Sequence, residues 1–192
     1  MKNVYNTCFT ALLLLMGLIF FATGCDEKKE PEITYEINDK NFYIMISNAV
    51  GLSFTDIYNQ NVAGKPTGNI EMTVDGPMGG KVTITGTTAL ADNGINMVDL
   101  VLNMNSVRYT YSLKDANNDQ WLSEVTMTGI ITYKGSWGTG FRSVNHQSDN
   151  MHIVGSVKYK DKTRTMNDSG KVSISSSTNV TAVDIFGHTS SW

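Results

Sequence analysis

From Ile70 onward, apolar residues alternate with polar residues at a period of two, in short runs separated by turn-forming residues. Such alternation predicts strands that bury one face and expose the other. The runs begin at Ile70, Val82, Val98, Val107, Trp121 and Met151, and shorter ones begin at Val172 and Val180. Glycine, asparagine and aspartate between the runs favour tight turns between antiparallel neighbours. We therefore predict an all-β fold from about residue 69, an antiparallel meander that forms a curved barrel or sandwich, with a closed or nearly closed barrel favoured.

A five-residue template recurs in three of the predicted strands, and each copy ends in glycine. The copies are Val82–Gly86, Val125–Gly129 and Met151–Gly155. In each copy the glycine takes a position on the apolar face of its strand, where it has no side chain to pack. A glycine there marks a bend, a bulge or a close approach of another part of the chain. Because curvature in sheets is made with such glycines, the repeat predicts a strongly curved sheet.

The segment before the first predicted strand fits two patterns. Phe42, Ile46 and the apolar residues that follow lie at helical spacing, whereas Phe42, Ile44 and Ile46 also alternate as they would in a strand. Asn38 stands where a helix N-cap is expected. We predict one N-terminal helix over about 41–60.

Residues 135–150 form the longest predicted loop, and residues 161–170 form another polar connection. Loops longer than ~12–15 residues in compact domains are often functional. A ligand-binding face is predicted at this loop from Tyr133, Trp137, Phe141, Arg142 and His146. Aromatic rings stack on sugars or pack against lipid, while the guanidinium and imidazole supply hydrogen bonds. The alternative is that the loop aromatics fold back as a lid over one end of the barrel.

A polar turn offers oxygen atoms at the spacing of a calcium loop. Asp115, Asn117 and Asp119 take alternate positions, from which oxygen ligands can converge on a hard cation. Two departures weaken this prediction, because Gln120 replaces the glycine of such loops and Thr126 replaces the bidentate glutamate. The alternative is a plain hairpin turn, which asparagine and aspartate favour.

Composition and motifs exclude several other functions. The net charge of −3 argues against a nucleic-acid binder, which needs a basic face. The sequence contains neither the Gly-x-Ser-x-Gly elbow of hydrolases nor a phosphate-binding loop with its lysine. The three histidines do not pair at metal-ligand spacing, and the carboxylates are scattered over turns. We predict no cofactor apart from the calcium ion considered above.

The first 25 residues have the pattern of an export signal. Lys2 is the only charged residue before Asp26, and the apolar run Ala11–Ala22 has twelve residues, which suits a signal-peptide core and is too short to span a bilayer. The sequence Ala-Thr-Gly-Cys at 22–25 resembles a bacterial lipobox, with alanine where leucine is commonest. The resemblance to bacterial lipoproteins is confined to these first 25 residues.

The resemblance implies cleavage before Cys25 and attachment of diacylglycerol to its thiol, followed by a further acyl chain. Two or more chains anchor a protein stably to a membrane. Residues 1–24 are then the signal peptide, 25–32 a flexible acidic tether and 33–192 a single β-rich domain. Because Cys8 is removed with the leader, no free thiol remains. We expect a lipid-anchored protein of the cell envelope, at the outer membrane, on either its periplasmic or its surface side.

These observations favour a non-catalytic envelope lipoprotein. Its partners would be membrane lipid through Cys25 and either a small apolar or glycan ligand or an envelope protein complex. Two other classes stay open: a hydrolase with a site assembled from scattered Asp, Glu and His residues, and a structural lipoprotein that only docks another protein. A site with two carboxylates, or a His–Asp pair, beside Trp137 would favour the hydrolase.

Overall fold

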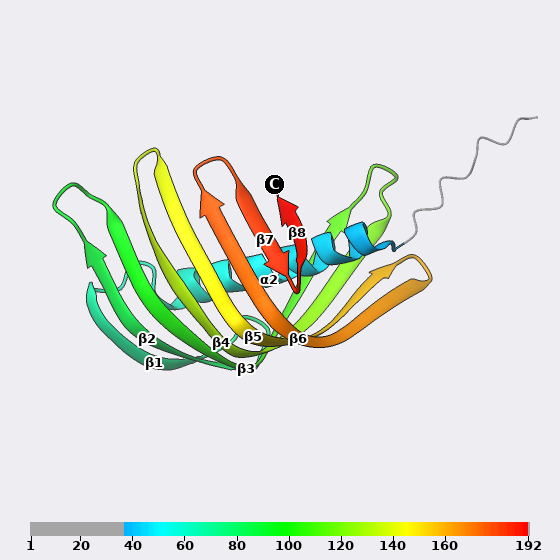
Figure 1. The fold of residues 1–192 in the computed structure, drawn as a ribbon, viewed down its shortest axis with the longest axis horizontal. Helices are drawn as coiled ribbons and strands as arrows, with labels where there is room; N and C mark the ends of the chain where they lie inside the picture. Colours follow the sequence, from blue (N-terminus) through cyan, green and yellow to red (C-terminus); the bar gives the residue numbers. More distant parts are fainter. Residues whose placement is uncertain (1–36, 192) are drawn as a thin grey trace, which may run out of the picture. The chain divides into compact units, whose positions relative to one another are not determined.

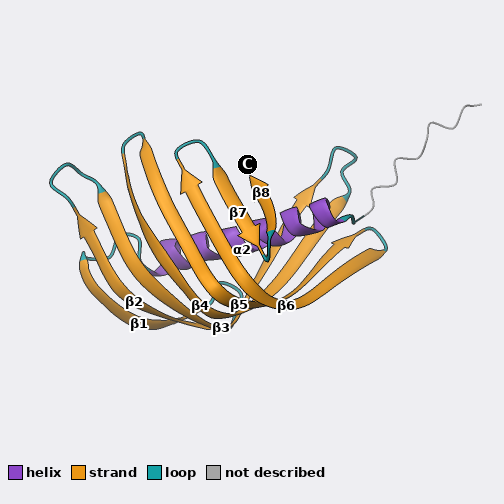
Figure 2. Ribbon diagram, in the orientation of Figure 1, coloured by secondary structure: helices purple, strands orange, loops and turns teal. Residues whose placement is uncertain are grey.

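The computed structural model describes residues 37–191, so Cys25, the leader and the tether lie outside the described residues. Within this range a helix precedes eight strands that pair in sequence order as one antiparallel sheet (Figure 1, Figure 2). The elements are α2 (Asp39–Asn61), β1 (Gly68–Asp75), β2 (Lys81–Leu90), β3 (Asn96–Lys114), β4 (Gln120–Gly138), β5 (Phe141–Tyr159), β6 (Lys162–Ser177), β7 (Thr181–Ile185) and β8 (His188–Ser191). The predicted antiparallel meander with one N-terminal helix is confirmed.

The sheet is open, so the favoured closed barrel is wrong. β1 pairs with β2 and β8 pairs with β7, and no ladder joins β1 to β8 in the described chain. Helix α2 lies along the concave side of the bent sheet (Figure 1) and covers the apolar face there. A barrel buries its inner face by closing, whereas here a helix fills the concave side. Within residues 37–191, α2 is the one helix, and it lacks the continuous apolar length needed to cross a bilayer.

Two predicted connections are strands instead. Residues 135–150 complete β4 and begin β5, which leaves only a two-residue turn at Thr139–Gly140. Residues 161–170 belong mainly to β6. Their polar and glycine-rich sequence predicts loops rather than strands. Such a sequence can still form strands, because one face of each strand is solvated and the hydrogen bonds between strands come from the backbone. These long strands extend the sheet well beyond the predicted runs.

Bulges bend the longest strands at neighbouring positions. The register shifts between Met104 and Val107 where β3 pairs with β4, and between Thr128 and Thr132 where β4 pairs with β5. A third shift separates Ser148 from Met151 on β5. A bulge adds residues to one strand and increases its bend and twist. The three shifts therefore explain how the strands curve around α2.

The glycines of the repeated template have two different structural roles. Gly86 and Gly129 have φ angles of 133° and 143°, which side-chain-bearing residues rarely adopt. Gly155 has no such angle, but a Cβ atom there would lie 2.9 Å from Cδ1 of Ile46 on α2. The first two glycines thus permit bends, while the third lets the helix approach the sheet, as the sequence predicted for glycines on the apolar face.

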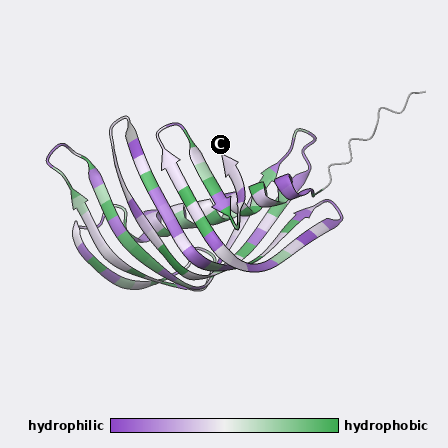
Figure 3. Ribbon diagram, in the orientation of Figure 1, coloured by the Kyte–Doolittle hydropathy of each residue, from purple (hydrophilic) through white to green (hydrophobic). Residues whose placement is uncertain are grey.

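Helix α2 begins where the sequence predicts a cap and buries one long apolar stripe. The side chain of Asn38 accepts a hydrogen bond from the backbone N–H of Asn41 at 2.9 Å, and Asp39 adds negative charge to the first turn. The buried apolar side chains of the helix are Phe42, Met45, Ile46, Ala49, Val50, Phe54 and Ile57. They meet the buried apolar residues of the sheet. Figure 3 shows the alternation of apolar and polar residues as green and purple bands along the strands.

The start of α2 is also tied to β6. The guanidinium of Arg164 lies 2.6 Å from the carboxylate of Asp39, donates to the carbonyl of Ile37 at 3.4 Å, and stands 4.5 Å from the ring centre of Phe42. A cation over an aromatic face is stabilising. These contacts fix the helix at one end, and its other half reaches β4 and β5.

Candidate functional site

A cleft of about 420 Å³ opens between the C-terminal half of α2 and the hairpin of β4 and β5. We call it the aromatic cleft. Its lining consists of Phe54, Thr55, Tyr58 and Asn59 from the helix and Tyr133, Trp137, Gly138, Arg142, Val144 and His146 from the hairpin. Pockets of this size hold small ligands, typically with apolar walls and a few polar groups.

The hairpin register brings the predicted residues together. Trp137 pairs with Arg142 and Tyr133 pairs with His146 across β4 and β5. Because successive side chains of a strand point to opposite faces, residues spaced by four lie on the same face, here the one that meets α2. Four of the five predicted ligand-binding residues thus line one cleft. The side chain of the fifth, Phe141, lies outside the described part of the structure.

Aromatic rings form the walls of the cleft. Tyr58 makes edge-to-face contacts with Tyr133 and Trp137, with ring centres 5.4 Å apart in both pairs. The imidazole of His146 lies between two rings, 4.3 Å from Tyr133 and 5.3 Å from Phe54, with interplanar angles of 17°. Such ring pairs stabilise beyond the burial of their area. The rings of Tyr133 and Trp137 belong to strand β4 and pack against α2, so they form a wall between the helix and the hairpin.

His146 is the buried polar group of this cleft. It is 8% exposed, and its Nδ1 atom has no hydrogen-bond partner among the described residues. Burial, together with the smaller effect of the positive charge of Arg142, lowers the pKa of His146 to about 3. Burial also raises the pKa values of Tyr58 and Tyr133. Near neutral pH the imidazole and both phenols are therefore uncharged.

Among the described residues, Arg142 is the only charged side chain that lines the cleft. The ion pairs of the described chain join Lys81 to Asp75, Lys134 to Asp99, Lys160 to Asp119 and Arg164 to Asp39. Arg142 belongs to none of them, and the lining contains no carboxylate. Neither two carboxylates nor a His–Asp pair lies beside Trp137 in the described chain.

The buried imidazole predicts a loss of stability in acid. The pKa of His146 is about 3 in the folded state, below the ordinary value of about 6.5, so the unfolded state binds the proton first as pH falls. The contribution is complete above pH ~6.5 and disappears towards pH ~3. His146→Phe keeps a ring between Phe54 and Tyr133 but has no group to protonate. Between pH ~6 and ~4.5 we therefore expect the free energy of unfolding to fall by about 2 kcal/mol less in this variant than in the unmodified protein.

Urea unfolding curves of both proteins across that pH range would measure this difference. The carboxylates contribute equally to both proteins, so they cancel in the comparison. Parallel pH profiles for His146→Phe and the unmodified protein would contradict the prediction.

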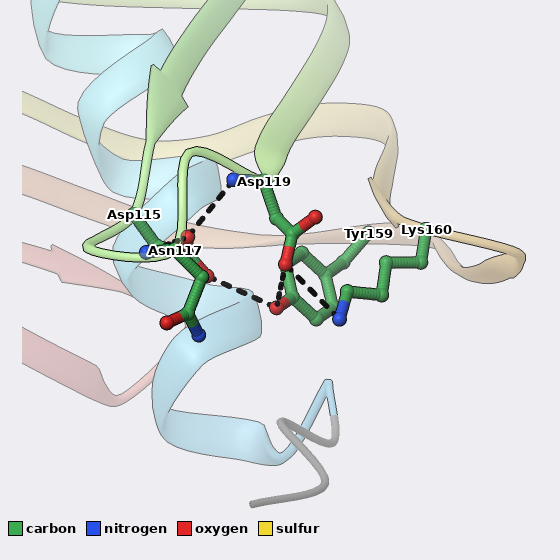
Figure 4. Close-up of polar contacts among 5 residues, drawn as sticks. All are labelled: Asp115, Asn117, Asp119, Tyr159 and Lys160. Atoms are coloured by element: carbon green, nitrogen blue, oxygen red, sulfur yellow. Dashed lines mark hydrogen bonds and ion pairs between the residues drawn. The ribbon is translucent and has the colours of Figure 1, made fainter.

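The predicted calcium residues form a hydrogen-bonded turn between β3 and β4 (Figure 4). One carboxylate oxygen of Asp115 accepts the backbone N–H groups of Asn117 and Asp119 at 2.9 and 3.0 Å. Its other oxygen accepts the hydroxyl of Tyr159 at 3.0 Å, and Asp119 lies 3.0 Å from the ammonium of Lys160. Aspartate side chains commonly close turns by bonding the backbone two residues ahead.

Both carboxylates of this turn have partners within the protein, Asp119 through an ion pair and Asp115 through hydrogen bonds. Although burial raises the pKa of Asp115, the hydrogen bonds from Tyr159 and the backbone outweigh it, and the pKa is lowered. The hydrogen bond to Asp119 raises the pKa of Lys160. Among residues 37–191, no group of three or more His, Cys, Asp or Glu side chains is arranged to hold a metal ion. The geometry fits the hairpin turn, and calcium binding by Asp115, Asn117 and Asp119 stays a prediction.

The helical half of the cleft was missed from the sequence. Phe54 and Tyr58 are spaced by four residues in a predicted helix, which indicates that they share a face. Nothing in that spacing indicates which strands the face meets, because this depends on the bend of the sheet. The spacing thus indicated that Phe54 and Tyr58 share a face, but only the structure shows that this face meets β4 and β5.

Two other depressions lie elsewhere on the described domain. One of about 650 Å³ lies on the outer side of the sheet beside Arg108 and Glu124, and one of about 540 Å³ lies between the start of α2 and β8. Both are larger than the aromatic cleft. Each has a single aromatic residue apart from histidine in its lining, whereas the aromatic cleft has four and a histidine that is 8% exposed. We therefore regard the aromatic cleft as the candidate site.

No known protein family, curated protein or solved structure matches this chain. The chemistry of the cleft must be inferred from its own residues. Aromatic walls, an uncharged imidazole, the side chains of Thr55 and Asn59, and one guanidinium can bind a small molecule through stacking and hydrogen bonds.

Proposed function

We propose that this protein is a lipid-anchored envelope protein that binds a small apolar or glycan ligand in the aromatic cleft without transforming it. The observation that carries the proposal is the convergence of Tyr133, Trp137, Arg142 and His146 with Tyr58 around one cleft. Lipid attachment at Cys25 is supported by the lipobox-like sequence. The acidic tether would separate the domain from the membrane.

The chemistry of the walls supports binding of a ring or an acyl chain. Tyr58 and Trp137 are partly exposed and held perpendicular to each other, at 89°. Amphipathic rings of this kind bind apolar surface and keep a polar edge in water. The unpartnered Nδ1 of His146 adds a reason to expect a polar ligand group, because buried polar atoms in native proteins nearly always have a partner.

The ligand role is tested with the mature lipoprotein purified in detergent. We expect a lipid retained in mass spectra or a rise in melting temperature with at least one member of a glycan panel. Trp137→Ala should abolish the effect, because it removes one wall of the cleft. Ile130→Ala is the matched control, since Ile130 is 57% exposed and does not line the cleft. A protein that neither retains lipid nor shifts in melting temperature has no ligand role of this kind.

The anchor is tested separately by labelling cells with radioactive palmitate. We expect Cys25→Ala to abolish labelling and to release the protein from the membrane fraction, because the thiol is the attachment point. Cys8→Ala is the matched control, since this cysteine lies in the predicted leader. Unchanged labelling of Cys25→Ala would overturn the lipid anchor while leaving the ligand role to its own test.

A further inference from the structure

The charge pattern around the aromatic cleft narrows the class of ligand. Arg142 is exposed, lies across the hairpin from Trp137, and has no carboxylate within ion-pair distance in the described chain. A guanidinium has a planar fork of donors that matches the two oxygens of a carboxylate. An anionic group placed here would meet an unpaired positive charge and no acidic side chain in the lining.

Arg142, rather than the buried His146, is the group in the cleft that would attract an anion by charge. His146 is uncharged near neutral pH, so it attracts hydroxyl groups through hydrogen bonds and does not attract anions by charge. Thr55 and Asn59 on the helical wall can also exchange hydrogen bonds with hydroxyl groups. The cleft thus has one end suited to an anion and a wall suited to neutral hydroxyls.

The aromatic rings of the cleft suit a ligand ring that has an apolar face. Trp137 and Tyr58 stand perpendicular with ring centres 5.4 Å apart, which presents two different aromatic surfaces. The volume of about 420 Å³ lies at the small end of the ~300–1,000 Å³ range of ligand pockets. A ligand of one or two rings fits these dimensions, and a long polymer would have to enter by its end.

We propose that the aromatic cleft selects a carboxylated sugar of the uronic acid class, with its carboxylate on Arg142 and its ring against Trp137 and Tyr58. This inference rests on the proposed function and specifies its ligand. The hydroxyl groups of the sugar bond to Asn59, Thr55 and the imidazole of His146. Neutral sugars bind through the same wall but lack the charge-assisted contact.

The inference is tested by titrating the full lipoprotein in detergent with glucuronic acid, galacturonic acid and their neutral parents, glucose and galactose, by calorimetry. We expect at least one acid to bind about tenfold more tightly than its neutral parent, because a charge-assisted hydrogen bond is stronger than a neutral one. Arg142→Gln should remove this preference and retain the neutral affinity. Arg108→Gln, also at an exposed arginine but on the outer side of the sheet, should keep the preference.

The outcomes separate the inference from the proposed function. Equal affinity for acids and neutral parents, or a preference that persists in Arg142→Gln, overturns the inference and leaves a neutral-ligand site. Tighter binding of glucose 6-phosphate than of either acid overturns the choice of a carboxylate. If no sugar binds, the inference is overturned, and a lipid found by mass spectrometry, and lost in Trp137→Ala, would preserve the ligand role.

Discussion

Replacing Gly86 by alanine is expected to lower the free energy of unfolding by about 3–4 kcal/mol. The φ angle of Gly86 is 133°, and a Cβ atom there would lie 2.1 Å from the carbonyl oxygen of Asp99. This neighbour is backbone of the paired strand and cannot rotate away. Backbone strain costs ~1–3 kcal/mol and overpacking costs ~1–3 kcal/mol, so both effects act in the same direction. Urea unfolding followed by circular dichroism measures the change.

Two other glycines serve as controls for this substitution. Gly51 lies within α2 with open space around its Cβ position, so Gly51→Ala should raise stability by up to ~1 kcal/mol. Gly94 has a φ angle of 77° but also open space, so Gly94→Ala isolates the strain. If Gly86→Ala were no more destabilising than Gly94→Ala, β2 and β3 would not approach each other closely at Gly86.

Replacing Phe54 by alanine is expected to cost about 4 kcal/mol of stability. Phe54 is 1% exposed and stacks on His146, so its removal leaves a cavity between α2 and β5. Substitutions of buried phenylalanine by alanine typically cost ~3–5 kcal/mol. The imidazole would also lose one of its two stacking partners, and water would gain access to Nδ1. We therefore expect the folded-state pKa of His146 to rise in this variant, which NMR titration measures.

A matched control lies two residues earlier in the same helix. Leu52 is 39% exposed, so Leu52→Ala should change stability by less than about 1 kcal/mol. Equal losses for Leu52→Ala and Phe54→Ala would mean that the face of α2 that meets the sheet has been assigned incorrectly.

Local sequence patterns were sufficient to predict the helix and most of the strands, but they missed the strand residues within 135–150 and 161–170. The alternation that begins at Ile70 and Val98 reports which side chains of each strand are buried, and Asn38 marks the start of α2. The same alternation is compatible with an open or a closed sheet. What decides between them is whether a helix fills the concave side, and this depends on contacts between distant segments, such as Ile46 with Gly155.

The residues of the candidate site could be predicted from the sequence, but their arrangement in space could not. Trp137 and Arg142 were selected for their chemistry within a supposed loop, whereas the two-residue turn aligns them as a cross-strand pair. Gly135 and Gly138 suggested a loop because glycine disfavours strands. In the sheet, Gly135 lies so close to β5 that a Cβ atom would be 2.6 Å from the carbonyl of Ser143. Glycine is required there by the close pairing of the two strands.

The sequential order of the strands has a consequence for how the chain folds. Each strand pairs with the one synthesised next, so hairpins can form one after another with little loss of loop entropy. Helix α2 comes before all of them in the chain, but it packs against β3, β4, β5, β7 and β8. The apolar stripe of α2 therefore stays exposed until nearly the whole sheet has assembled. We expect the chain to be most prone to aggregation during this interval.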